Sequence, residues 1–199
     1  LEPESLNCEA ILQAWYPGQA GGQAVAEVLF GDYNPAGKLP LTFYRNLAQI
    51  PDFEDYNMTG RTYRYMKETP LFPFGHGLSY TTFKYGKLKM NDDKIAAGQN
   101  LNLVIPVTNT GSRDGDEVVQ VYLKKKDDTE GPVKTLRAFK RVRIPAGKTV
   151  EVKFSLDDTQ LEWWDEQSNT MRVCPGNYTV MIGGTSCEKS LLSRAFTIR

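Results

Sequence analysis

The feature that most constrains the fold is a set of short runs, in the second half of the chain, in which apolar side chains occupy alternate positions. Successive side chains of a strand point to opposite faces, so this alternation predicts strands that bury one face. The run Asp116–Leu123 is apolar on both faces, which predicts an inner strand, and Arg194–Arg199 predicts a last strand. The alternating runs are Leu101–Asn109, Thr149–Leu156 and Asn177–Gly183.

Turn-forming residues separate these runs, at Asn109–Gly111, Pro145–Gly147 and Pro175–Gly176. About seven strands within roughly 115 residues, with no helical period, are typical of an immunoglobulin-like β-sandwich. We therefore expect residues 85–199 to form such a sandwich and to fold by themselves. The fold class predicted for the whole chain is mainly β, with a truncated α/β segment before the sandwich.

Residues 1–84 are predicted to contain that truncated α/β segment. Ala10–Trp15 is a short apolar run that predicts a buried strand, and Ala20–Leu29 carries the stripe of a closely packed helix, which Gly31 is placed to end. Lys38–Tyr44 predicts a second extended piece, at a sheet edge or strand start because Pro40 lacks a backbone donor. Two strands and one helix cannot cover both faces of a sheet, so we expect the rest of the sheet to come from elsewhere.

The sequence between Gln49 and Phe83 is aperiodic, rich in aromatic residues and interrupted by prolines. A loop of this length is uncommon and tends to be functional or to wrap another surface. Its segment Asp52–Tyr65 allows two interpretations. It forms either the lip of a sugar site or an arm that packs on neighbouring domains with Arg61 and Arg64 in ion pairs, and we favour the arm.

Charge and composition exclude several functional classes. The 24 basic residues balance the 24 acidic ones, so neither nucleic acid nor an anionic membrane is expected as a partner. No apolar run reaches the roughly 18 residues of a membrane-spanning helix. The first ten residues lack the basic start and apolar core of a signal peptide.

The three cysteines and one histidine predict no metal site, and no cofactor is expected. Cys8, Cys174 and Cys187 are expected to be separate buried thiols. A disulfide between Cys174 and Cys187 is the alternative if the protein is exported, because these two residues flank one predicted strand.

Six ordered blocks resemble the carboxy-terminal part of glycoside hydrolase family 3 enzymes, the β-glucosidases and β-xylosidases. They cover nearly the whole chain: "WYPGQAGGQAVAEVLFGDYNPAGKLPLTF" (15–43), "GRTYRY" (60–65), "PLFPFGHGLSYTTF" (70–83), "VTNTGSRDGDEVVQVYL" (107–123), "LRAFKRVRIPAGKTVEV" (136–152) and "PGNYTVMIGG" (175–184). "GRTYRY" and "FGHGLSY" look slightly closer to the β-xylosidase-like members.

The resemblance implies a barrel with a nucleophilic aspartate, an α/β sandwich domain with an acid/base glutamate, and a fibronectin type III-like domain. Residues 1–84 would be the end of the second domain, with a long aromatic loop, and residues 85–199 the third. The partners implied are the upstream domains and the oligosaccharide substrate of the parent enzyme. The resemblance also implies a periplasmic or secreted location.

No catalytic residue is predicted in this chain. A retaining glycosidase needs two carboxyl groups about 5 to 5.5 Å apart, one of them with a raised pKa. The acidic residues of the first half show no spacing that defines such a pair, and we expect each to lie in a turn or on a solvated face: Glu27, Asp32, Asp52, Glu54 and Asp55.

Three further features are expected to be structural. His76, between two glycines, is a turn residue rather than an acid/base. Of Trp163 and Trp164, one is expected to fill the sandwich core and the other to lie near the surface, with an exposed carbohydrate platform as the alternative. The sequons at Asn57 and Asn177 matter only in a glycosylating host.

The leading hypothesis is an inactive carboxy-terminal fragment of an exo-acting, retaining β-glycosidase that removes terminal β-glucosyl or β-xylosyl residues. A second hypothesis makes the chain a non-catalytic accessory module for domain docking or carbohydrate binding. A third has residues 1–83 pair with a separate polypeptide that carries the catalytic domains.

Overall fold

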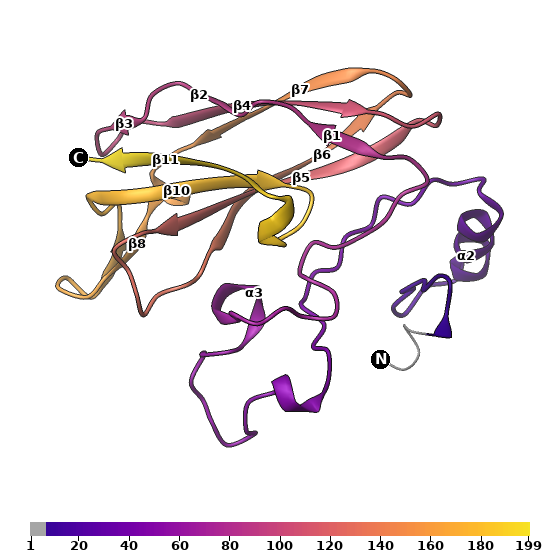
Figure 1. Cartoon of the computed structure of the whole chain (residues 1–199), viewed down its shortest axis with the longest axis horizontal. Helices are drawn as coiled ribbons and strands as arrows, with labels where there is room; N and C mark the ends of the chain where they lie inside the picture. Colours follow the sequence, from indigo (N-terminus) through magenta and orange to yellow (C-terminus); the bar gives the residue numbers. More distant parts are fainter. Residues whose placement is uncertain (1–6) are drawn as a thin grey trace.

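The computed structural model describes residues 7–199. Residues 1–6 lie outside the described residues. They include the start of the predicted α/β segment and part of the amino-terminal stretch in which no signal peptide is predicted. The described chain has two parts that differ in packing: a β-sandwich, and a first half with few regular elements that extends from it (Figure 1).

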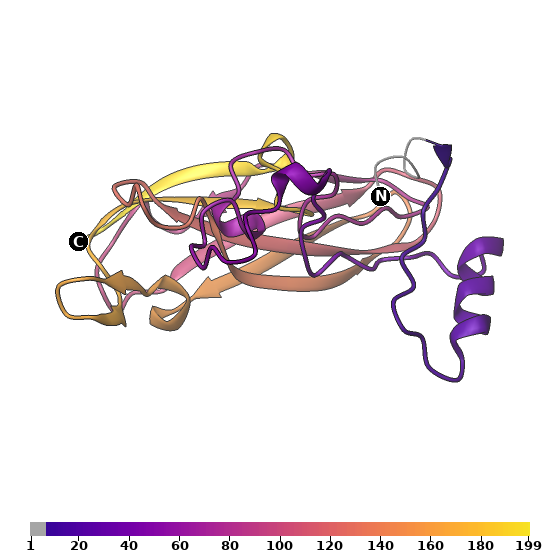
Figure 2. The same cartoon turned by 90° about the horizontal axis from the view of Figure 1, so that it is seen from below.

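The sandwich has two sheets that face one another (Figures 1 and 2). In the first sheet β4 is central, with β1 and β2 paired to one side and β7 to the other, all antiparallel. The second sheet has the order β3-β11-β10-β5-β6, in which β3 and β11 alone run parallel. The strands of the first sheet are β1 (Phe83–Tyr85), β2 (Lys89–Met90), β4 (Leu101–Asn109) and β7 (Thr149–Leu156). Those of the second are β3 (Lys94–Ile95), β5 (Gly115–Lys125), β6 (Thr135–Ile144), β10 (Gly176–Gly183) and β11 (Leu192–Ile198).

Smaller elements complete the described chain. A two-stranded hairpin pairs β8 with β9, and α4 precedes it with a capping box in which Asp157 and Gln160 satisfy the first turn. The elements are α2 (Gly21–Phe30), η1 (Leu47–Gln49), α3 (Thr62–Tyr65), α4 (Asp158–Leu161), β8 (Trp163–Asp165), β9 (Thr170–Arg172) and η2 (Glu188–Ser190).

The predicted alternation is confirmed by the burial of the strands. Every apolar side chain on the inner face of β4 and of β10 is fully buried between the two sheets. The predicted inner strand is β5, which lies between β10 and β6 and is largely buried on both faces. The inner-face residues are Leu101, Leu103, Ile105 and Val107 in β4, and Tyr178, Val180 and Ile182 in β10.

The predicted boundary between residues 84 and 85 falls inside β1, which begins at Phe83. Phe83 pairs with Asn109 of β4, so the sandwich gains its first strand two residues earlier than the sequence pattern indicates.

In the first half, α2 confirms the predicted helix. Gly31 ends it in the left-handed region, with φ 82°, and donates its backbone N–H to Val28 O at 3.1 Å. Within α2 the buried residue is Gly21, whereas Leu29 and Phe30 are 66% and 86% exposed. Figures 1 and 2 both place α2 to one side of the sandwich, and Val25 and Val28 are half-buried, so the predicted close packing of this helix is not seen among the described residues.

The predicted strand Ala10–Trp15 is wrong. The residues have no strand pairing and are exposed, and Trp15 has a φ of 55°, which a strand residue does not adopt. A strand that is apolar on both faces depends on neighbouring strands, and residues 7–199 supply none beside it. Lys38–Tyr44 is extended as predicted, but it forms one isolated bridge, between Phe43 and Phe72, instead of a sheet strand.

Candidate functional site

The acidic residues of the first half lie on two segments, with Glu27 and Asp32 at α2 and with Asp52, Glu54 and Asp55 together in the loop before α3. Glu27 is on α2, where its Oε1 accepts from Gln23 Nε2 at 2.7 Å, and Asp32 follows that helix. Asp55 accepts at Oδ1 from the backbone N–H and the side-chain amide of Asn57, at 2.9 and 2.8 Å. The backbone hydrogen bond from Asn57 is the largest cause that lowers the pKa of Asp55, the opposite of what a general acid needs. That the chain carries no catalytic residue stays a prediction.

Residues 47–76 form an arm that leaves the sandwich and returns to it, and its two parts differ. The arm tip, residues 47–61, projects from the molecule (Figure 1), and the rings of Phe53 and Tyr56 are 94% and 92% exposed. The tip encloses an open cavity of about 550 Å³ with a mainly apolar lining. The lining residues are Leu47, Ile50, Pro51, Phe53, Asp55, Tyr56, Met58 and Arg61.

The arm root, residues 62–76, packs against the outer face of the second sheet. Tyr63 stacks on Phe74 with ring centroids 4.4 Å apart and meets the edge of Tyr122, in β5, at 5.8 Å. The Tyr63 hydroxyl accepts from the backbone N–H of Leu136 at 3.1 Å, and Phe74 O accepts from Ser186 N at 2.9 Å. The interpretation of this segment as a packing arm is therefore confirmed for its root.

The expected ion pairs of Arg61 and Arg64 are not formed with any acidic residue in the described part of the chain. Arg61 donates instead to backbone carbonyls of the arm tip: to Asn57 O at 3.0 Å, to Asp52 O at 3.2 Å and to Asp55 O. A loop without ladder hydrogen bonds leaves its carbonyls in need of donors, and a guanidinium supplies several. The guanidinium of Arg64 lies over the ring of Tyr65, 5.5 Å from its centroid.

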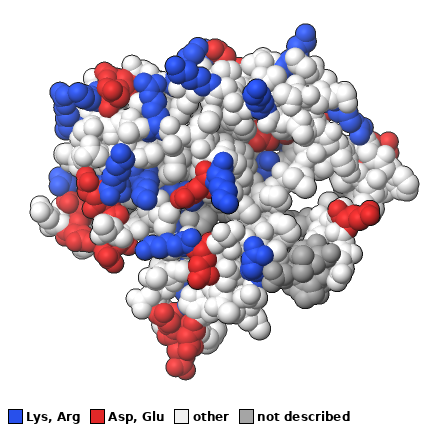
Figure 3. Space-filling view, in the orientation of Figure 1, with Lys and Arg blue, Asp and Glu red and all other residues white. Residues whose placement is uncertain are grey.

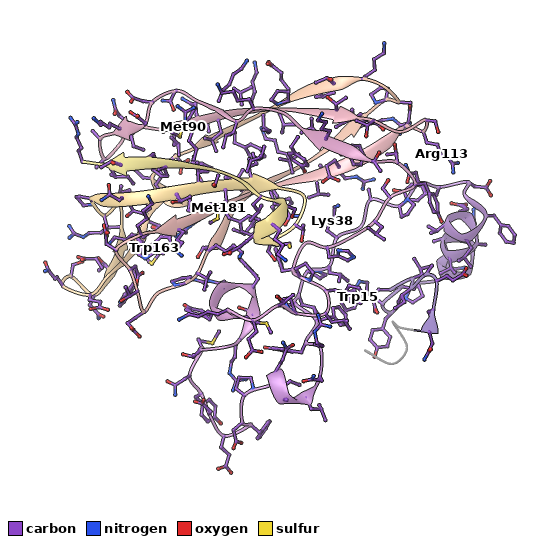
Figure 4. The ribbon with its side chains drawn as sticks, in the orientation of Figure 1. Trp15, Lys38, Met90, Arg113, Trp163 and Met181 are labelled. Carbon is purple, nitrogen blue, oxygen red and sulfur yellow. The ribbon has the colours of Figure 1, made fainter. Side chains whose placement is uncertain are left out.

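A buried ion pair joins the extended segment before the arm to β5, and the sequence pattern does not identify it. Lys38 Nζ lies 3.3 Å from Glu117 Oε2, with the two side chains 15% and 6% exposed. Lys38 also donates to Gly77 O at 3.0 Å, and Glu117 Oε1 accepts from the Tyr85 hydroxyl at 2.8 Å. Figure 4 shows Lys38 between the extended segment and the sandwich. Burial and the Glu117 carboxylate raise the pKa of Tyr85.

His76 occupies the structural position expected of it. Its ring stacks on Phe72 at 5.3 Å, its backbone N–H donates to Pro73 O at 3.0 Å, and its carbonyl accepts from Leu39 N at 2.8 Å. Burial, and next the positive charge of Lys38, lower the pKa of the imidazole. The neighbouring aromatic ring and lysine offer no carboxylate that would orient an acid/base histidine.

The prediction for the tryptophan pair is confirmed. Trp163 is 3% exposed and lies in the core beside Tyr178, with its indole N–H donating to Asp128 Oδ2 at 2.6 Å, whereas Trp164 is 49% exposed. Figure 4 shows Trp163 directed into the end of the sandwich below β10. Cys8, Cys174 and Cys187 are free thiols, as expected, but their predicted burial is confirmed for Cys174 alone, since Cys8 is exposed and Cys187 is half-buried.

Residues 7–199 contain no cluster of three or more His, Cys, Asp or Glu side chains that would hold a metal ion. Within the same residues no helix has the length and apolar character that a membrane crossing requires. Lysine and arginine side chains are interspersed with acidic ones over the sandwich (Figure 3), so no large surface of one sign appears on this face.

Exposed apolar side chains are concentrated outside the sandwich. Of the nineteen large apolar residues that are exposed in the described chain, fifteen lie between residues 11 and 80. Concentrations of this kind mark surfaces that contact other protein or ligand. The geometry therefore supports a docking role for the first half more than a chemical one.

Comparisons with known proteins agree with this division. The profile of the glycosyl hydrolase family 3 C-terminal domain matches residues 1–80, and that of the fibronectin type III-like domain matches residues 117–186. A xylan 1,4-beta-xylosidase from Xylanibacter ruminicola is 52% identical over all of this chain, and a periplasmic beta-glucosidase from Salmonella typhimurium is 38% identical over 94% of it.

The solved structure of a β-glucosidase from Erythrobacter marinus superposes with a TM-score of 0.84, at 39% identity over 98% of the chain. The chain spans 23% and 26% of the length of the two curated relatives and 26% of the solved one. The two successive domain matches, the similarity to these relatives and the fold together show that this chain belongs to glycoside hydrolase family 3 and corresponds to the carboxy-terminal part of the proteins it matches.

Proposed function

We propose that this chain is the docking and structural part of an exo-acting, retaining β-glycosidase, and that the catalytic carboxylates lie in the upstream domains of the parent. Residues 1–84 are the end of the α/β sandwich domain, and residues 85–199 are the fibronectin type III-like domain. The partners of the chain are the barrel and α/β domains that precede it in the parent.

The observation that carries this proposal is the contrast between the two halves. The sandwich buries its core side chains between two sheets, while α2 and the arm tip expose apolar side chains such as Phe30 and Phe53. Each large apolar side chain left in water forgoes about 1.5–3 kcal/mol of burial. Such a surface is favourable only when another layer of protein covers it.

The substrate proposed for the parent is an oligosaccharide with a terminal β-xylosyl or β-glucosyl residue. The 52% identity to a protein named xylan 1,4-beta-xylosidase supports xylosyl as the preferred residue. A periplasmic or secreted location is proposed on the family resemblance, and the name of the relative described as a periplasmic beta-glucosidase supports it.

The test is to read the codons upstream of Leu1, express the longer protein and measure kcat/KM on nitrophenyl β-xyloside and nitrophenyl β-glucoside. We expect a barrel with a nucleophilic aspartate upstream and a kcat/KM that favours the xyloside. A start codon at this point, or a longer protein with no activity on either substrate, would overturn the proposal.

Saturable binding of xylo- or cello-oligosaccharides by the isolated chain would instead favour an accessory carbohydrate-binding module. Titration calorimetry with both oligosaccharide series provides that measurement, and we expect no saturable heat.

A further inference from the structure

The junction between the arm root and β6 brings two arginines together from distant parts of the sequence. Val133 N donates to Arg64 O at 2.6 Å and Leu136 N donates to the Tyr63 hydroxyl at 3.1 Å, which holds α3 beside the start of β6. Arg137 follows at once in β6. The positive charge of Arg64 contributes, after burial, to lowering the pKa of Arg137, as expected for two neighbouring cations.

The two guanidinium groups have covered faces and unpaired edges. The face of Arg64 lies over Tyr65 and that of Arg137 over Trp163, 5.5 and 5.3 Å from the ring centroids. Arg137 Nη2 donates to the backbone carbonyl of Glu162 at 2.7 Å. The Nε atoms of both arginines are buried and make no hydrogen bond. Two charged donors are thus left without acceptors.

A third unpaired polar atom lies two residues before Arg137 in β6. Thr135, 9% exposed, has a buried hydroxyl with no hydrogen-bond partner. The nearby carboxylate of Asp128 is already engaged, since Oδ1 accepts from Gly131 N and Oδ2 from the Trp163 indole. Glu188 pairs with Lys134, at 3.4 Å. The negative charge of Glu162 acts to raise the pKa of Arg137, yet Arg137 Nε has no hydrogen-bond partner among the described residues. Buried donors without acceptors are uncommon in folded proteins, so the two neighbouring arginine Nε donors call for an acceptor from outside the described residues.

We propose that this junction is a binding site for a carboxylate, held by the Nε edges of Arg64 and Arg137. A carboxylate presents two oxygens in one plane and matches the donors of a guanidinium edge. Both arginines remain partly exposed, which leaves an approach for the anion. The carboxylate belongs either to an aspartate or glutamate of the upstream domains or to a small free anion, and the experiment separates these sources.

The direct test is a titration of the purified chain with sodium acetate against sodium chloride at equal ionic strength, followed by NMR of the arginine Nε–H groups. We expect the resonances of Arg64 and Arg137 to shift with acetate along one binding curve. Arg113 is the internal control, because its guanidinium already donates to Gly31 O, and its Nε–H resonance should stay in place. Equal shifts at all three arginines, or none at Arg64 and Arg137, would overturn the site.

Variants give a second readout. Arg64→Gln should weaken the acetate response at Arg137 about tenfold, as expected for loss of one charge-assisted hydrogen bond. Arg64→Lys keeps the charge and should still weaken it, whereas Arg113→Gln should leave it unchanged. If Arg64→Gln fails to fold, the wild-type titration still decides. An unchanged response in folded Arg64→Gln would contradict the proposal.

The melting temperature (Tm) of the longer protein distinguishes an upstream side chain from a free anion as the source of the carboxylate. This experiment rests on the proposed function, because it requires the upstream domains. If an upstream side chain fills the site, acetate leaves the Tm unchanged and Arg64→Gln lowers it. If the anion is free, acetate raises the Tm of the longer protein and of the chain alike. If neither acetate nor Arg64→Gln changes the Tm, the proposed site is overturned. The titration of the chain alone does not depend on the parent's activity, so it can fail separately from the proposed function.

Discussion

At the scale of single residues, the contact that most clearly ties the first half to the sandwich is the ion pair of Lys38 and Glu117. Both side chains are buried, and Glu117 also accepts from the Tyr85 hydroxyl. A buried pair costs much desolvation and is weak support for stability by itself, but the loss of one partner leaves the other charge buried and unpaired.

Replacement of Glu117 by alanine is therefore expected to lower the free energy of unfolding by about 3–5 kcal/mol, because Lys38 and the Tyr85 hydroxyl both lose their acceptor. Urea unfolding followed by tryptophan fluorescence gives this value. Glu151→Ala is the matched control: its pair with Lys89 is long, at 3.8 Å, and both side chains are more than half exposed. A change of about 0.5 kcal/mol or less is expected there, and similar losses in the two variants would contradict the account.

The acid dependence of stability follows from carboxylates whose pKa is lowered in the folded state. The Thr159 hydroxyl lowers the pKa of Asp157, and the Ser168 hydroxyl followed by Arg172 lowers that of Asp165. Their stabilising effect is complete above the ordinary carboxyl pKa of 3.8 and is lost as the pH falls through the lower folded values.

We expect urea midpoints to be level from about pH 6 to pH 5 and to fall below about pH 4. The double variant Asp157→Asn, Asp165→Asn keeps side-chain oxygens that accept hydrogen bonds but does not titrate, so its midpoint should fall less steeply. An equal slope in both proteins would show that these two carboxylates are not responsible.

At the scale of elements, the sandwich strands were predictable because burial on one face leaves a period of two in the sequence. Leu101, Leu103 and Ile105 show it, and each is fully buried. The pattern does not identify β6, an edge strand whose middle is exposed and carries Lys140 and Arg141. An exposed edge strand does not need apolar side chains at every second position, so its sequence lacks the period of two that identifies the other strands.

The contacts of the arm were beyond prediction for a different reason. Tyr63 meets Tyr122, and Lys38 meets Glu117, across separations that no local period encodes. The failed strand Ala10–Trp15 has the converse cause: its composition is that of a buried strand, but strands need neighbours, and the described chain has none there. The absence of a catalytic pair follows from the family resemblance and from unfavourable spacings, and it remains a prediction.

The packing of the arm root against the second sheet depends on Gly75. Its φ is 77°, and a Cβ there would lie 2.2 Å from Gln120 Oε1. Gly75→Ala should therefore displace the root, and the amide of Ser186, which donates to Phe74 O, should exchange its hydrogen faster. Gly147→Ala is the control, with φ 69° and open space around the Cβ. It should cost only the roughly 1–2 kcal/mol of left-handed strain and leave Ser186 exchange unchanged.

Faster Ser186 exchange in both variants would show that strain alone, and not the clash with Gln120, disturbs the arm. Protected exchange in Gly75→Ala would show that the arm root does not need the close approach of residue 75 to β5.

At the scale of the whole molecule, the two halves should differ in what holds them together. Leu103→Ala empties space at the centre of the sandwich, where the side chain is fully buried, and should lower the free energy of unfolding by about 3–5 kcal/mol. Leu29→Ala removes the same atoms from a side chain that is 66% exposed on α2 and should change it by about 0.5 kcal/mol or less. Differential scanning calorimetry of both variants measures the two values.

In a longer protein that includes the upstream domains, the effect of Leu29→Ala on the free energy of unfolding should increase. If upstream domains cover α2, Leu29→Ala should become clearly destabilising there, while the effect of Leu103→Ala stays similar. An unchanged, negligible effect of Leu29→Ala in the longer protein would contradict docking of α2 against those domains.

The central claim, that this chain is a non-catalytic part of a glycoside hydrolase, is tested most directly by an assay of the purified chain. Its folding is first checked by a cooperative melt, and release of nitrophenol from nitrophenyl β-xyloside and nitrophenyl β-glucoside is then followed at high protein concentration. We predict no release above that of buffer, because no paired carboxylates with the required geometry are expected in the chain. Saturable turnover that a Glu→Gln or Asp→Asn substitution within residues 7–199 abolishes would contradict the claim.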